Sequence, residues 1–307
     1  SDGTQANGSS VTPALSADGR LVAFSSLADN LVPADSNGSL DIFIYDRDTG
    51  QTNLISVASD GSQTNADASG PVLSADGQVV AFSSSASNLV VGDTDATDDV
   101  FIHDSATGST VLGRPFANLR GPAEFNSPQV AAGGSVIAFA SDADDLVQGD
   151  TNDRMDIFLH DRTTGQTSRV SVTSGGAQAD GSSFSPALSA DGRFVAFASD
   201  ADNLVPGDSN QSQDIFVHDR ATGQTTRVGA ASDGPQATAS AQPPALSANG
   251  RFVAFASDAR DLIPGDTNAT TDIFVHDRDT GLTTRVSVTS DGTQANGSSV
   301  TPALSAD

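Results

Sequence analysis

The sequence predicts an all-β protein, a five-bladed β-propeller whose blades are four-stranded antiparallel sheets of about 58 residues each. Two observations predict this class. One phrase recurs at a nearly constant step along the whole chain, and each step contains four short apolar runs separated by turn sequences. No segment shows helical periodicity over a useful length. A β-solenoid is disfavoured because its coils are shorter and seldom carry Asp-Gly hairpin signals.

Two phrases mark the repeat. The serine of L-S-A recurs, with one alanine replacement, at Ser16, Ser74, Ala131, Ser189, Ser247 and, in a truncated sixth copy, Ser305. The aromatic position of D-[I/V]-F-x-[H/Y]-D recurs at Tyr45, His103, His160, His218 and His276. Because one such copy cannot bury its own sheet, we expect residues 1–307 to form a single domain of five repeats.

The elements of the first copy follow from its turn signals. A first strand is expected over Thr12–Ser16, and Asp18-Gly19 then turns the chain because Gly accepts a positive φ. The remaining elements are expected as a strand over Leu21–Ser26, a long loop over Leu27–Leu40, a strand over Asp41–Asp46, a turn over Asp48–Gly50 and a strand over Thr52–Val57. The strands V-A-F and I-F-V are apolar on successive residues, which indicates that both faces of each blade are covered.

The chain is strongly acidic. It has 39 acidic and 14 basic residues, for a formal net charge of -25, and all but Glu124 of the acidic residues are Asp. Such a charge repels nucleic acids and anionic membranes, so no nucleic-acid partner is expected. No apolar run is long enough to span a bilayer, so no membrane insertion is expected. The lack of Cys excludes disulfides and thiol chemistry.

The fourth copy shows the repeat in full. Ser185–Asn210 reads S-P-A-L-S-A-D-G-R-F-V-A-F-A-S-D-A-D-N-L-V-P-G-D-S-N, and Asp214–Val228 reads D-I-F-V-H-D-R-A-T-G-Q-T-T-R-V. This repeat resembles the TolB-type, WD-repeat-like β-propeller repeat of bacteria over all five copies, although no W-D dipeptide is present. The resemblance implies a propeller module, often non-catalytic, in a protein that is extracellular, on the cell surface or in the periplasm. It predicts fold better than activity.

The two ends of the chain repeat each other. Residues Ser1–Asp18 and Ser290–Asp307 are identical in sequence, which suggests an engineered or excised piece of a longer repeat protein. The spare first strand, Thr301–Ser305, is expected to complete the blade that continues at Leu21 and so to close the ring of a monomer. Alternatively, this strand pairs with another molecule in a strand-exchanged oligomer.

The loop between the second and third strands of each copy carries the strongest site signal, D-x-[N/D]-x-x-x-D. Three oxygen-bearing side chains on a tight turn suit a structural Ca²⁺ ion, which takes about six to eight oxygen ligands. Backbone carbonyls, such as that of Ser39, and water are expected to complete the shell. The alternative is a set of Asx turns without an ion. The predicted metal ligands are Asp35, Asn37, Asp41, Asp93, Asp95, Asp99, Asp150, Asn152, Asp156, Asp208, Asn210, Asp214, Asp266, Asn268 and Asp272.

No catalytic residue is predicted. The four histidines each precede an Asp, but adjacent residues of a strand point to opposite faces and cannot form a catalytic pair. Tyr45 takes the same place in the first copy, which favours a packing role. Two catalytic carboxylates in a glycosidase would also break the symmetry of the repeat. We therefore expect that the chain is not an enzyme.

The expected function is a non-catalytic structural or interaction module that is stabilised by Ca²⁺. Polar connectors between the copies leave a lectin-like propeller that binds a glycan or a peptide as the alternative, and a glycan-active enzyme as a more distant one. These connectors are Gln5–Asn7, Gln63–Asn65, Gln178–Asp180 and Gln236–Thr238. The sequence does not identify a ligand.

Overall fold

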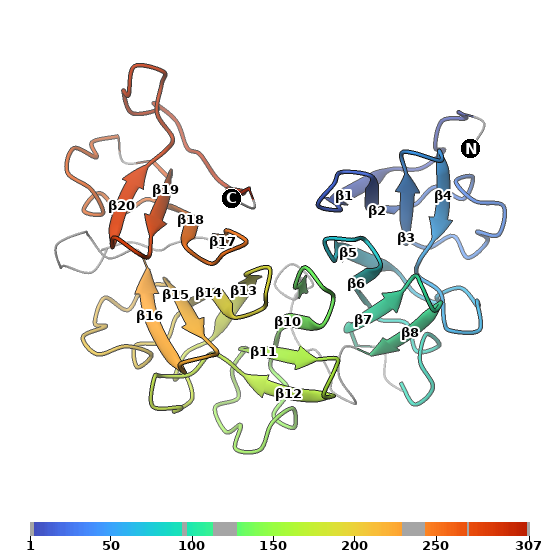
Figure 1. Cartoon of the computed structure of the whole chain (residues 1–307), viewed down its shortest axis with the longest axis horizontal. Coiled ribbons are helices and arrows are strands. Elements are labelled where there is room, and N and C mark those ends of the chain that lie inside the picture. Colours follow the sequence, from blue (N-terminus) through green and yellow to red (C-terminus); the bar gives the residue numbers. More distant parts are fainter. Residues whose placement is uncertain (1–2, 94–96, 113–127, 229–242, 269, 306–307) are drawn as a thin grey trace. The chain divides into compact units, whose positions relative to one another are not determined.

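Five four-stranded antiparallel sheets make up the computed structural model, which describes residues 3–93, 97–112, 128–228, 243–268 and 270–305 (Figure 1). The first sheet consists of β1 (Ser10–Leu15), β2 (Leu21–Ser26), β3 (Asp41–Asp46) and β4 (Gln51–Leu54). The second consists of β5 (Ala68–Leu73), β6 (Val79–Ser84), β7 (Asp99–Asp104) and β8 (Ser109–Leu112). The third consists of β9 (Gln129–Val130), β10 (Val136–Ser141), β11 (Asp156–Asp161) and β12 (Gln166–Arg169).

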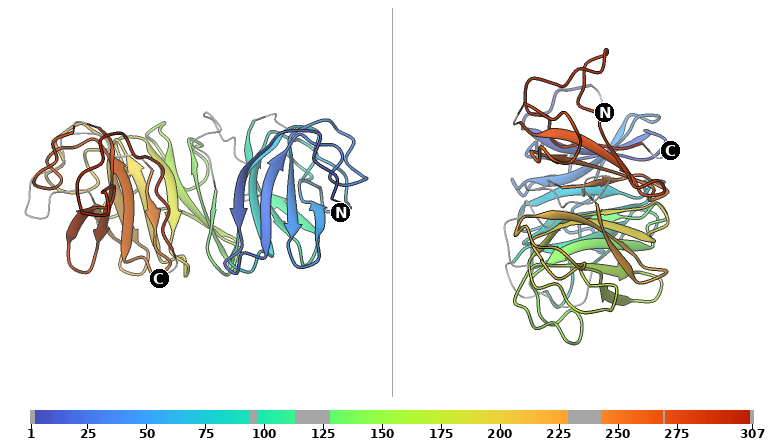
Figure 2. Two further views of the ribbon diagram at one scale, coloured as in Figure 1. Left: turned by 90° about the horizontal axis from the view of Figure 1, so that it is seen from above. Right: turned by 90° about the vertical axis from the view of Figure 1, so that its left-hand side faces the viewer.

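The fourth sheet consists of β13 (Ser183–Leu188), β14 (Phe194–Ser199), β15 (Asp214–Asp219) and β16 (Gln224–Val228). The fifth consists of β17 (Ala245–Leu246), β18 (Phe252–Ser257), β19 (Asp272–Asp277) and β20 (Leu282–Arg285). The order within each sheet follows the chain, as in the blades of a propeller (Figure 2). The predicted fold class, all-β with five four-stranded blades, is therefore confirmed. None of the described residues forms a helix of the length and apolarity needed to cross a membrane.

The chain divides into two compact units within the third blade. The first unit comprises Ser1–Gln148 and Leu159–Ser168, and the second comprises Gly149–Phe158 and Arg169–Asp307. In the first unit, Ile42 and Ile44 of β3 pack with Val80 and Phe82 of β6, so the core lies between the first two blades. In the second unit, Ile215 and Val217 of β15 share a cluster with residues of the fifth blade, Val253 and Phe255 among them.

Paired phenylalanines occupy the middle of the blades. Phe24 of β2 lies opposite Phe43 of β3, with ring centroids 5.9 Å apart, and Phe197 and Phe216 repeat this pair at 6.0 Å. All six residues of β6 are buried, and so are all six of β15. Strands that are covered on both faces explain why the apolar residues of the sequence do not alternate with polar ones.

The observed bounds of the first blade test the predictions strand by strand. β2 and β3 begin and end at the predicted residues, whereas β1 begins two residues earlier than predicted. β4 ends at Leu54 rather than at Val57, where only half of the backbone pair with Ile42 remains: the amide of Ile55 donates to the carbonyl of Ile42 at 2.8 Å. The amide of Ile42 donates to the hydroxyl oxygen of Ser56 at 3.1 Å instead of to a backbone carbonyl.

A bulge distorts the first strand of the blades. The register between β1 and β2 shifts between Val11 and Ala14, and Thr12 within this shift has φ 47°. Gly70 and Ser185, at the equivalent places, have φ 63° and 51°. Thr301 in the C-terminal copy has φ 51°, although it belongs to no strand. The residue before Pro13 and the residue before Pro302 therefore adopt the same positive-φ conformation, whether or not they belong to a paired strand.

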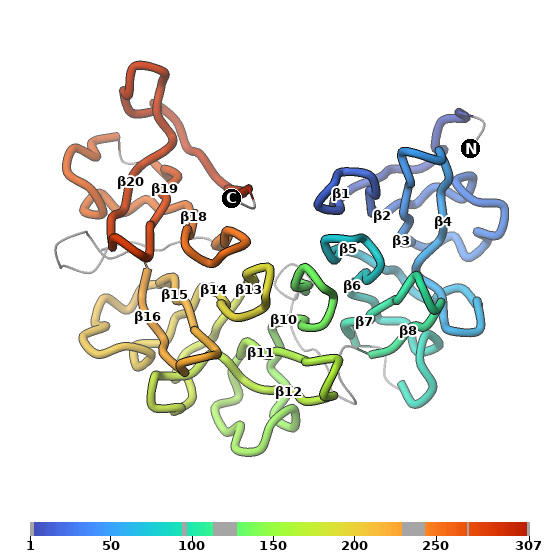
Figure 3. The backbone as a smooth tube through the Cα atoms, in the orientation of Figure 1, coloured from blue at the N-terminus to red at the C-terminus, as the bar shows by residue number. Residues whose placement is uncertain are grey.

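The C-terminal copy lies against the fifth blade. The amide of Ser299 donates to the carbonyl of Thr271 at 2.7 Å. Pro302 and Leu304 border an apolar cavity of about 450 Å³ together with Ile273 and Val275 of β19. Figure 3 follows the backbone of the C-terminal copy as it runs back toward β18. In the first blade, the place of the first strand is taken by β1, which pairs with β2. Ring closure by the C-terminal copy stays a prediction.

Candidate functional site

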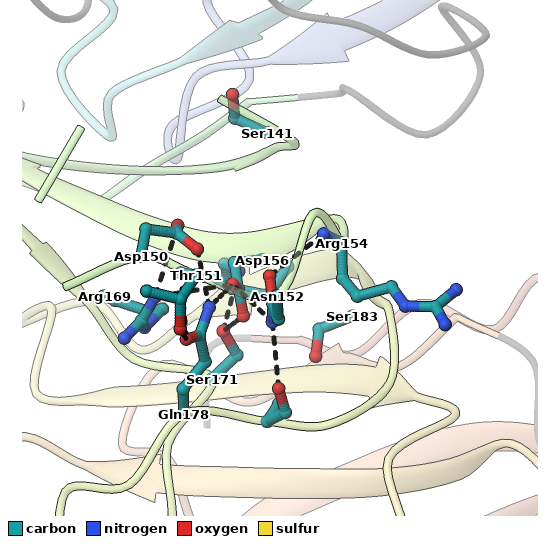
Figure 4. A network of polar contacts seen from close by, with 12 residues as sticks. Ser141, Asp150, Thr151, Asn152, Arg154, Asp156, Arg169, Ser171, Gln178 and Ser183 are labelled. Atoms are coloured by element: carbon teal, nitrogen blue, oxygen red, sulfur yellow. Dashed lines mark hydrogen bonds and ion pairs between the residues drawn. The ribbon is translucent and has the colours of Figure 1, made fainter. Parts of the chain in front are cut away.

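The acidic loop of the third blade joins β10 to β11 and shows how these loops are built (Figure 4). Asp156 is the first residue of β11 and is fully buried. The hydroxyl of Ser171 donates to Oδ1 of Asp156 and accepts from the amide of Ile157 at 3.1 Å. Burial raises the pKa of Asp156, although hydrogen bonds from Ser171 and Gln178 and the charge of Arg169 act in the opposite direction. The carboxylate is thus fixed at the start of the strand in a polar but dry environment.

Gln178, in the connector that leaves this blade, joins the two acidic residues of the loop. Its Nε2 donates to Oδ1 of Asp150 at 2.6 Å and to Oδ2 of Asp156 at 3.1 Å. Its Oε1 accepts from the amide of Thr151 at 3.3 Å. Gln294 binds Asp266 and Asp272 of the fifth blade in the same way, at 2.7 and 3.0 Å. The connector glutamines are therefore part of the acidic loops.

An arginine at the end of the fourth strand faces both carboxylates. Nη1 of Arg169 lies 3.2 Å from Oδ2 of Asp150 and 3.6 Å from Oδ2 of Asp156. The guanidinium supplies a positive charge at the place where a cation was predicted. Equivalent ion pairs, at 3.5 to 4.0 Å, join Arg227 to Asp208 and Asp214, and Arg285 to Asp266 and Asp272.

These three arginines were not among the residues predicted from the sequence. The signal that reveals them is the fourth strand itself, which ends in Arg-Val in the last three copies. The first two copies have Leu54 and Leu112 at this position. This position is arginine in three copies and leucine in two, always at the same distance from the acidic loop. Such a position is a candidate counter-ion for the carboxylates of the loop.

The asparagine of each motif forms an Asx turn. Oδ1 of Asn152 accepts from the amide of Arg154 at 2.9 Å, and Nδ2 donates to the carbonyl of Ala179 at 2.9 Å. Oδ1 of Asn37, Asn210 and Asn268 accepts in the same way from the amide two residues on, at 3.0, 2.9 and 3.1 Å. The amide oxygen that was predicted as a metal ligand is therefore engaged by backbone in these loops.

The loop of the first blade differs because Leu54 takes the place of the arginine. Asp41 is fully buried, and the hydroxyl of Ser56 donates to its Oδ1 at 2.5 Å. Oδ2 of Asp41 has no hydrogen-bond partner among the described residues. Nε2 of Gln63 donates to Asp35 at 3.2 Å. Burial raises the pKa of Asp41, and the charges of Asp35 and Asp67 raise it further.

The loop of the second blade is described only in part. Asp93 and Asp99 lie at its two ends, whereas Asp95 lies outside the described residues. Across the part of the chain that is described, no three His, Asp or Glu side chains gather as a group that could hold a metal ion. The Ca²⁺ ligands named from the sequence stay a prediction.

The histidines contact the fourth strand of their own blade. Nδ1 of His103 lies 2.9 Å from the hydroxyl oxygen of Thr110, and that hydroxyl donates to the carbonyl of Val57 at 2.5 Å. Since the hydroxyl proton is already used, Nδ1 of His103 carries the proton and Nε2 is an acceptor. Burial lowers the pKa of His103, which favours the neutral ring. Equivalent contacts join His160, His218 and His276 to Thr167, Thr225 and Thr283.

Amide side chains tie two of the described connectors, those that contain Asn65 and Asp180, to the blade that follows. Oδ1 of Asn88 accepts from the amide of Asn65 at 3.0 Å, and its Nδ2 donates to the carbonyl of Gln63 at 2.7 Å. Asn203 repeats both contacts with Asp180 and Gln178, at 3.1 and 2.8 Å. One connector is therefore bound to the acidic loop of the blade it leaves and to the long loop of the blade it enters.

Comparison with known proteins shows what this arrangement is similar to. No family model matches the chain, and no curated protein matches it in sequence. TolB from Acinetobacter baumannii is 18% identical with a TM-score of 0.50, over 90% of this chain and 53% of that one. A putative TolB from Agrobacterium tumefaciens is 15% identical with a TM-score of 0.53, over 92% of this chain and 82% of that one. The chain thus spans about half the length of the first of these proteins.

Propellers of peptidases are similar as well. The β-propeller domain of the Trilobed protease from Pyrococcus furiosus is 10% identical with a TM-score of 0.53, over 91% of this chain and 72% of that one. The tricorn protease matches with a TM-score of 0.53 at 12% identity, over 90% of this chain and 30% of that one. These likenesses confirm the TolB-type β-propeller as the fold that the sequence resembles, and they leave its function open.

Proposed function

We propose that this chain is a non-catalytic β-propeller module that serves as a scaffold for interactions. The observation that carries this proposal is the repetition of the polar contacts. His103 and His218 contact threonine hydroxyls in the same way, and Arg169 and Arg285 each face two carboxylates in the same way. Catalysis needs one asymmetric constellation of acid, base or nucleophile, whereas these groups are used for structure in blade after blade.

A screen for activity tests the absence of catalysis. The purified protein is incubated with panels of glycan, peptide and ester substrates, and a heat-unfolded sample serves as the control. We expect no turnover above the control. Turnover that disappears in a folded His103→Gln or His218→Gln variant would contradict the proposal, because it would give a structural histidine a chemical role.

We propose an extracellular, cell-surface or periplasmic location in a bacterium. The net charge of -25 and the TolB-type fold support it. The proposal is tested by fractionating cells that produce the native protein and detecting it with an antibody. A signal confined to the cytosol would contradict it.

We further propose that a structural Ca²⁺ ion binds in the loop of the first blade. This loop combines two carboxylates, Asp35 and Asp41, without the arginine found in the last three blades. Oδ2 of Asp41 is buried and has no hydrogen-bond partner among the described residues, although the Asn37 side chain acts to lower the pKa of this carboxyl. Such an oxygen is costly to bury unless a proton or a cation satisfies it. With few protein ligands, the affinity is expected to be weak, with a Kd of about 10⁻⁴–10⁻³ M.

Leu54→Arg is the variant that tests this proposal, since it introduces the counter-ion of the third blade. Thermal unfolding is measured with millimolar CaCl₂, with MgCl₂ and with a chelator. Because Leu112 leaves the second loop without an arginine as well, both proteins carry Leu112→Arg as a background substitution. We expect Ca²⁺ to raise the melting temperature of the protein with Leu54, and Leu54→Arg to remove most of this response. An equal Ca²⁺ response in both proteins, or none in the protein with Leu54, would contradict the site.

A further inference from the structure

An arginine follows the third strand in four of the five copies and binds the hairpin of its own blade. Nη1 of Arg162 donates to the carbonyl of Gly134 at 2.9 Å, and Nη1 of Arg220 donates to the carbonyl of Gly192 at 2.8 Å. Arg47 and Arg278 make the same contact with Gly19 and Gly250, at 2.8 and 2.5 Å. The guanidinium group is thus a fixed part of these hairpins.

Two of these guanidinium groups also contact the preceding blade. Nη2 of Arg162 lies 3.2 Å from Oδ2 of Asp104 at the end of β7. The guanidinium carbon of Arg278 lies 4.2 Å from the ring centroid of Phe194, the first residue of β14. Arg162 and Arg278 therefore each bridge two neighbouring blades, the first with a charge-assisted hydrogen bond and the second with a cation–π contact.

The second blade has Ser105 in place of this arginine. A cavity of about 380 Å³ lies there, between the first and second blades. Its lining includes Gly77 of the hairpin, Asp46 at the end of β3 and Leu21 at the start of β2. These residues are equivalent in the repeat to those that Arg162 and Arg278 contact in the other blades. Exposed Asn53 and Ser105 also border it, while Ile44 and Ile55 are buried.

The polar groups of this cavity are suited to a donor. His103 borders it and is an acceptor at Nε2, since Nδ1 donates to Thr110. Oδ2 of Asp46 accepts one hydrogen bond, from Nη2 of Arg20 at 2.7 Å, and has a second lone pair. The carbonyl of Gly77 corresponds to the carbonyls that accept from arginine in the other four blades. A guanidinium has five donors and no acceptor, which matches these three groups.

Arg20 does not prevent a second guanidinium from binding beside Asp46. The fourth and fifth blades show the same combination within the molecule. Asp219 accepts a bidentate pair of hydrogen bonds from Arg193, at 2.8 Å each, and the guanidinium groups of Arg193 and Arg278 both lie over the ring of Phe194. Asp48, 3.6 Å from Nε of Arg20, adds a further negative charge near the cavity.

We propose that the cavity between the first two blades binds a guanidinium group, presented as an arginine side chain of a partner peptide or protein. The bound side chain takes the place that Arg162 and Arg278 occupy from within the chain. It donates to Asp46, Gly77 and His103 while its plane lies over Leu21. This proposal extends the scaffold role to one named interface, and it does not depend on Ca²⁺.

A short capped peptide, acetyl-Gly-Arg-Gly-amide, is the probe. Binding is followed by calorimetry and by NMR shifts of the protein, and the citrulline and lysine peptides are the matched controls. The citrulline peptide keeps the shape but lacks the charge. We expect the arginine peptide to bind about tenfold or more tightly than the citrulline peptide, as a charge-assisted hydrogen bond implies. Equal binding of both peptides, or preference for neutral oligosaccharides, would overturn the proposal.

Ser105→Arg is the variant that fills the cavity from within. Four blades already carry arginine at this position, so the variant is expected to fold. We expect its melting temperature to rise and its affinity for the arginine peptide to fall by about tenfold or more, because the side chain competes for the same acceptors. An unchanged affinity in a folded Ser105→Arg protein would overturn the proposal.

Arg162→Ser is the reciprocal variant, which creates the same vacancy beside Asp104. We expect a lower melting temperature that acetyl-arginine-amide partly restores and acetyl-citrulline-amide does not. Equal effects of the two compounds would show that the site does not recognise the guanidinium. Failure of these tests would leave the scaffold role standing, whereas turnover in the activity screen would overturn that role without affecting arginine binding.

Discussion

Nη1 of Arg169 lies 3.2 Å from Oδ2 of Asp150, and neither side chain is more than one-tenth exposed, at 10% and 4%. A buried ion pair of this kind adds modest net stability, because both charges lose their hydration. Removing one partner strongly destabilises the folded protein, since the other charge then stays buried without compensation. The acidic loops therefore depend on whichever positive charge faces their carboxylates.

Arg169→Leu gives the third blade the residue that the first blade carries at this position. We expect a loss of about 3–5 kcal/mol in the free energy of unfolding, because Asp150 and Asp156 remain buried without their counter-ion. Urea unfolding measures this loss. The variant is also expected to gain a stabilising response to Ca²⁺. A loss below the error of the measurement would show that Gln178 and solvent suffice to hold the carboxylates.

Asp41→Asn isolates the effect of pH on the first loop. The pKa of Asp41 is raised above its ordinary value of 3.8 by burial, with Asp35 and Asp67 adding to the shift and Ser56 and Asn37 opposing it. A raised pKa stabilises the folded protein below the ordinary value, and this stability is lost as the pH rises through the pKa of the folded state. Relative to Asp41→Asn, the parent protein should therefore lose stability as the pH rises above 3.8. A difference in unfolding free energy that does not change with pH would contradict this.

Asp153→Gly should stabilise the loop of the third blade. Asp153 has φ 52°, a left-handed conformation, and Gly38 holds the equivalent place in the first blade with φ 69°. Relief of this backbone strain, offset by the greater freedom of glycine in the unfolded chain, should add up to about 1 kcal/mol. Chemical denaturation measures the gain.

Gly38→Asp is the reciprocal control for this prediction. A Cβ atom at Gly38 meets no atom within 4 Å, so the substitution reports backbone conformation rather than a clash. We expect this variant to lose stability by an amount similar to that gained in Asp153→Gly. A loss in both variants would show that the side chain of Asp153 contributes more than its backbone costs.

Gly250→Ala and Gly19→Ala form a matched pair that measures the packing between blades. The two glycines lie at equivalent places in the hairpins of the first and fifth blades, with φ 68° and 72°. The backbone strain of introducing alanine is therefore about the same in both variants. A Cβ atom at Gly250 would lie 2.2 Å from the ring of Phe194, whereas at Gly19 the nearest atom is Nη1 of Arg47 at 3.7 Å. Gly250→Ala should therefore unfold more easily by about 1–3 kcal/mol. Equal losses would mean that Phe194 moves aside without cost.

The sequence was sufficient to predict the repeat, the hairpins and most strand bounds, because these depend on local signals. Asp18-Gly19 and the apolar run after it specify β2 to the residue. The end of β4 was not predictable, since the hydroxyl of Ser56 takes the place of a backbone carbonyl as the acceptor for the amide of Ile42, while the amide of Ile55 still donates to the carbonyl of Ile42. Such a substitution of side chain for backbone leaves no signature in the strand pattern.

The acidic loops were found by their spacing, but the partners of their carboxylates were not. Arg169 and Gln178 come from the fourth strand and from the connector, and only the fold brings them to Asp150. The cavity beside Ser105 was not predictable from the sequence either. A missing arginine becomes visible only when the arginines of the other blades are seen to cross between neighbours.

The kink at Thr301 resembles that at Thr12, with φ 51° and 47°, although only Thr12 belongs to a strand. The conformation is thus set by a handful of adjacent residues and does not require pairing in a strand. A segment that is shaped before it docks loses less freedom when it does so, which lowers the entropic cost of adding a blade. Growth of the propeller by duplication would then start from pieces that already have the right bend.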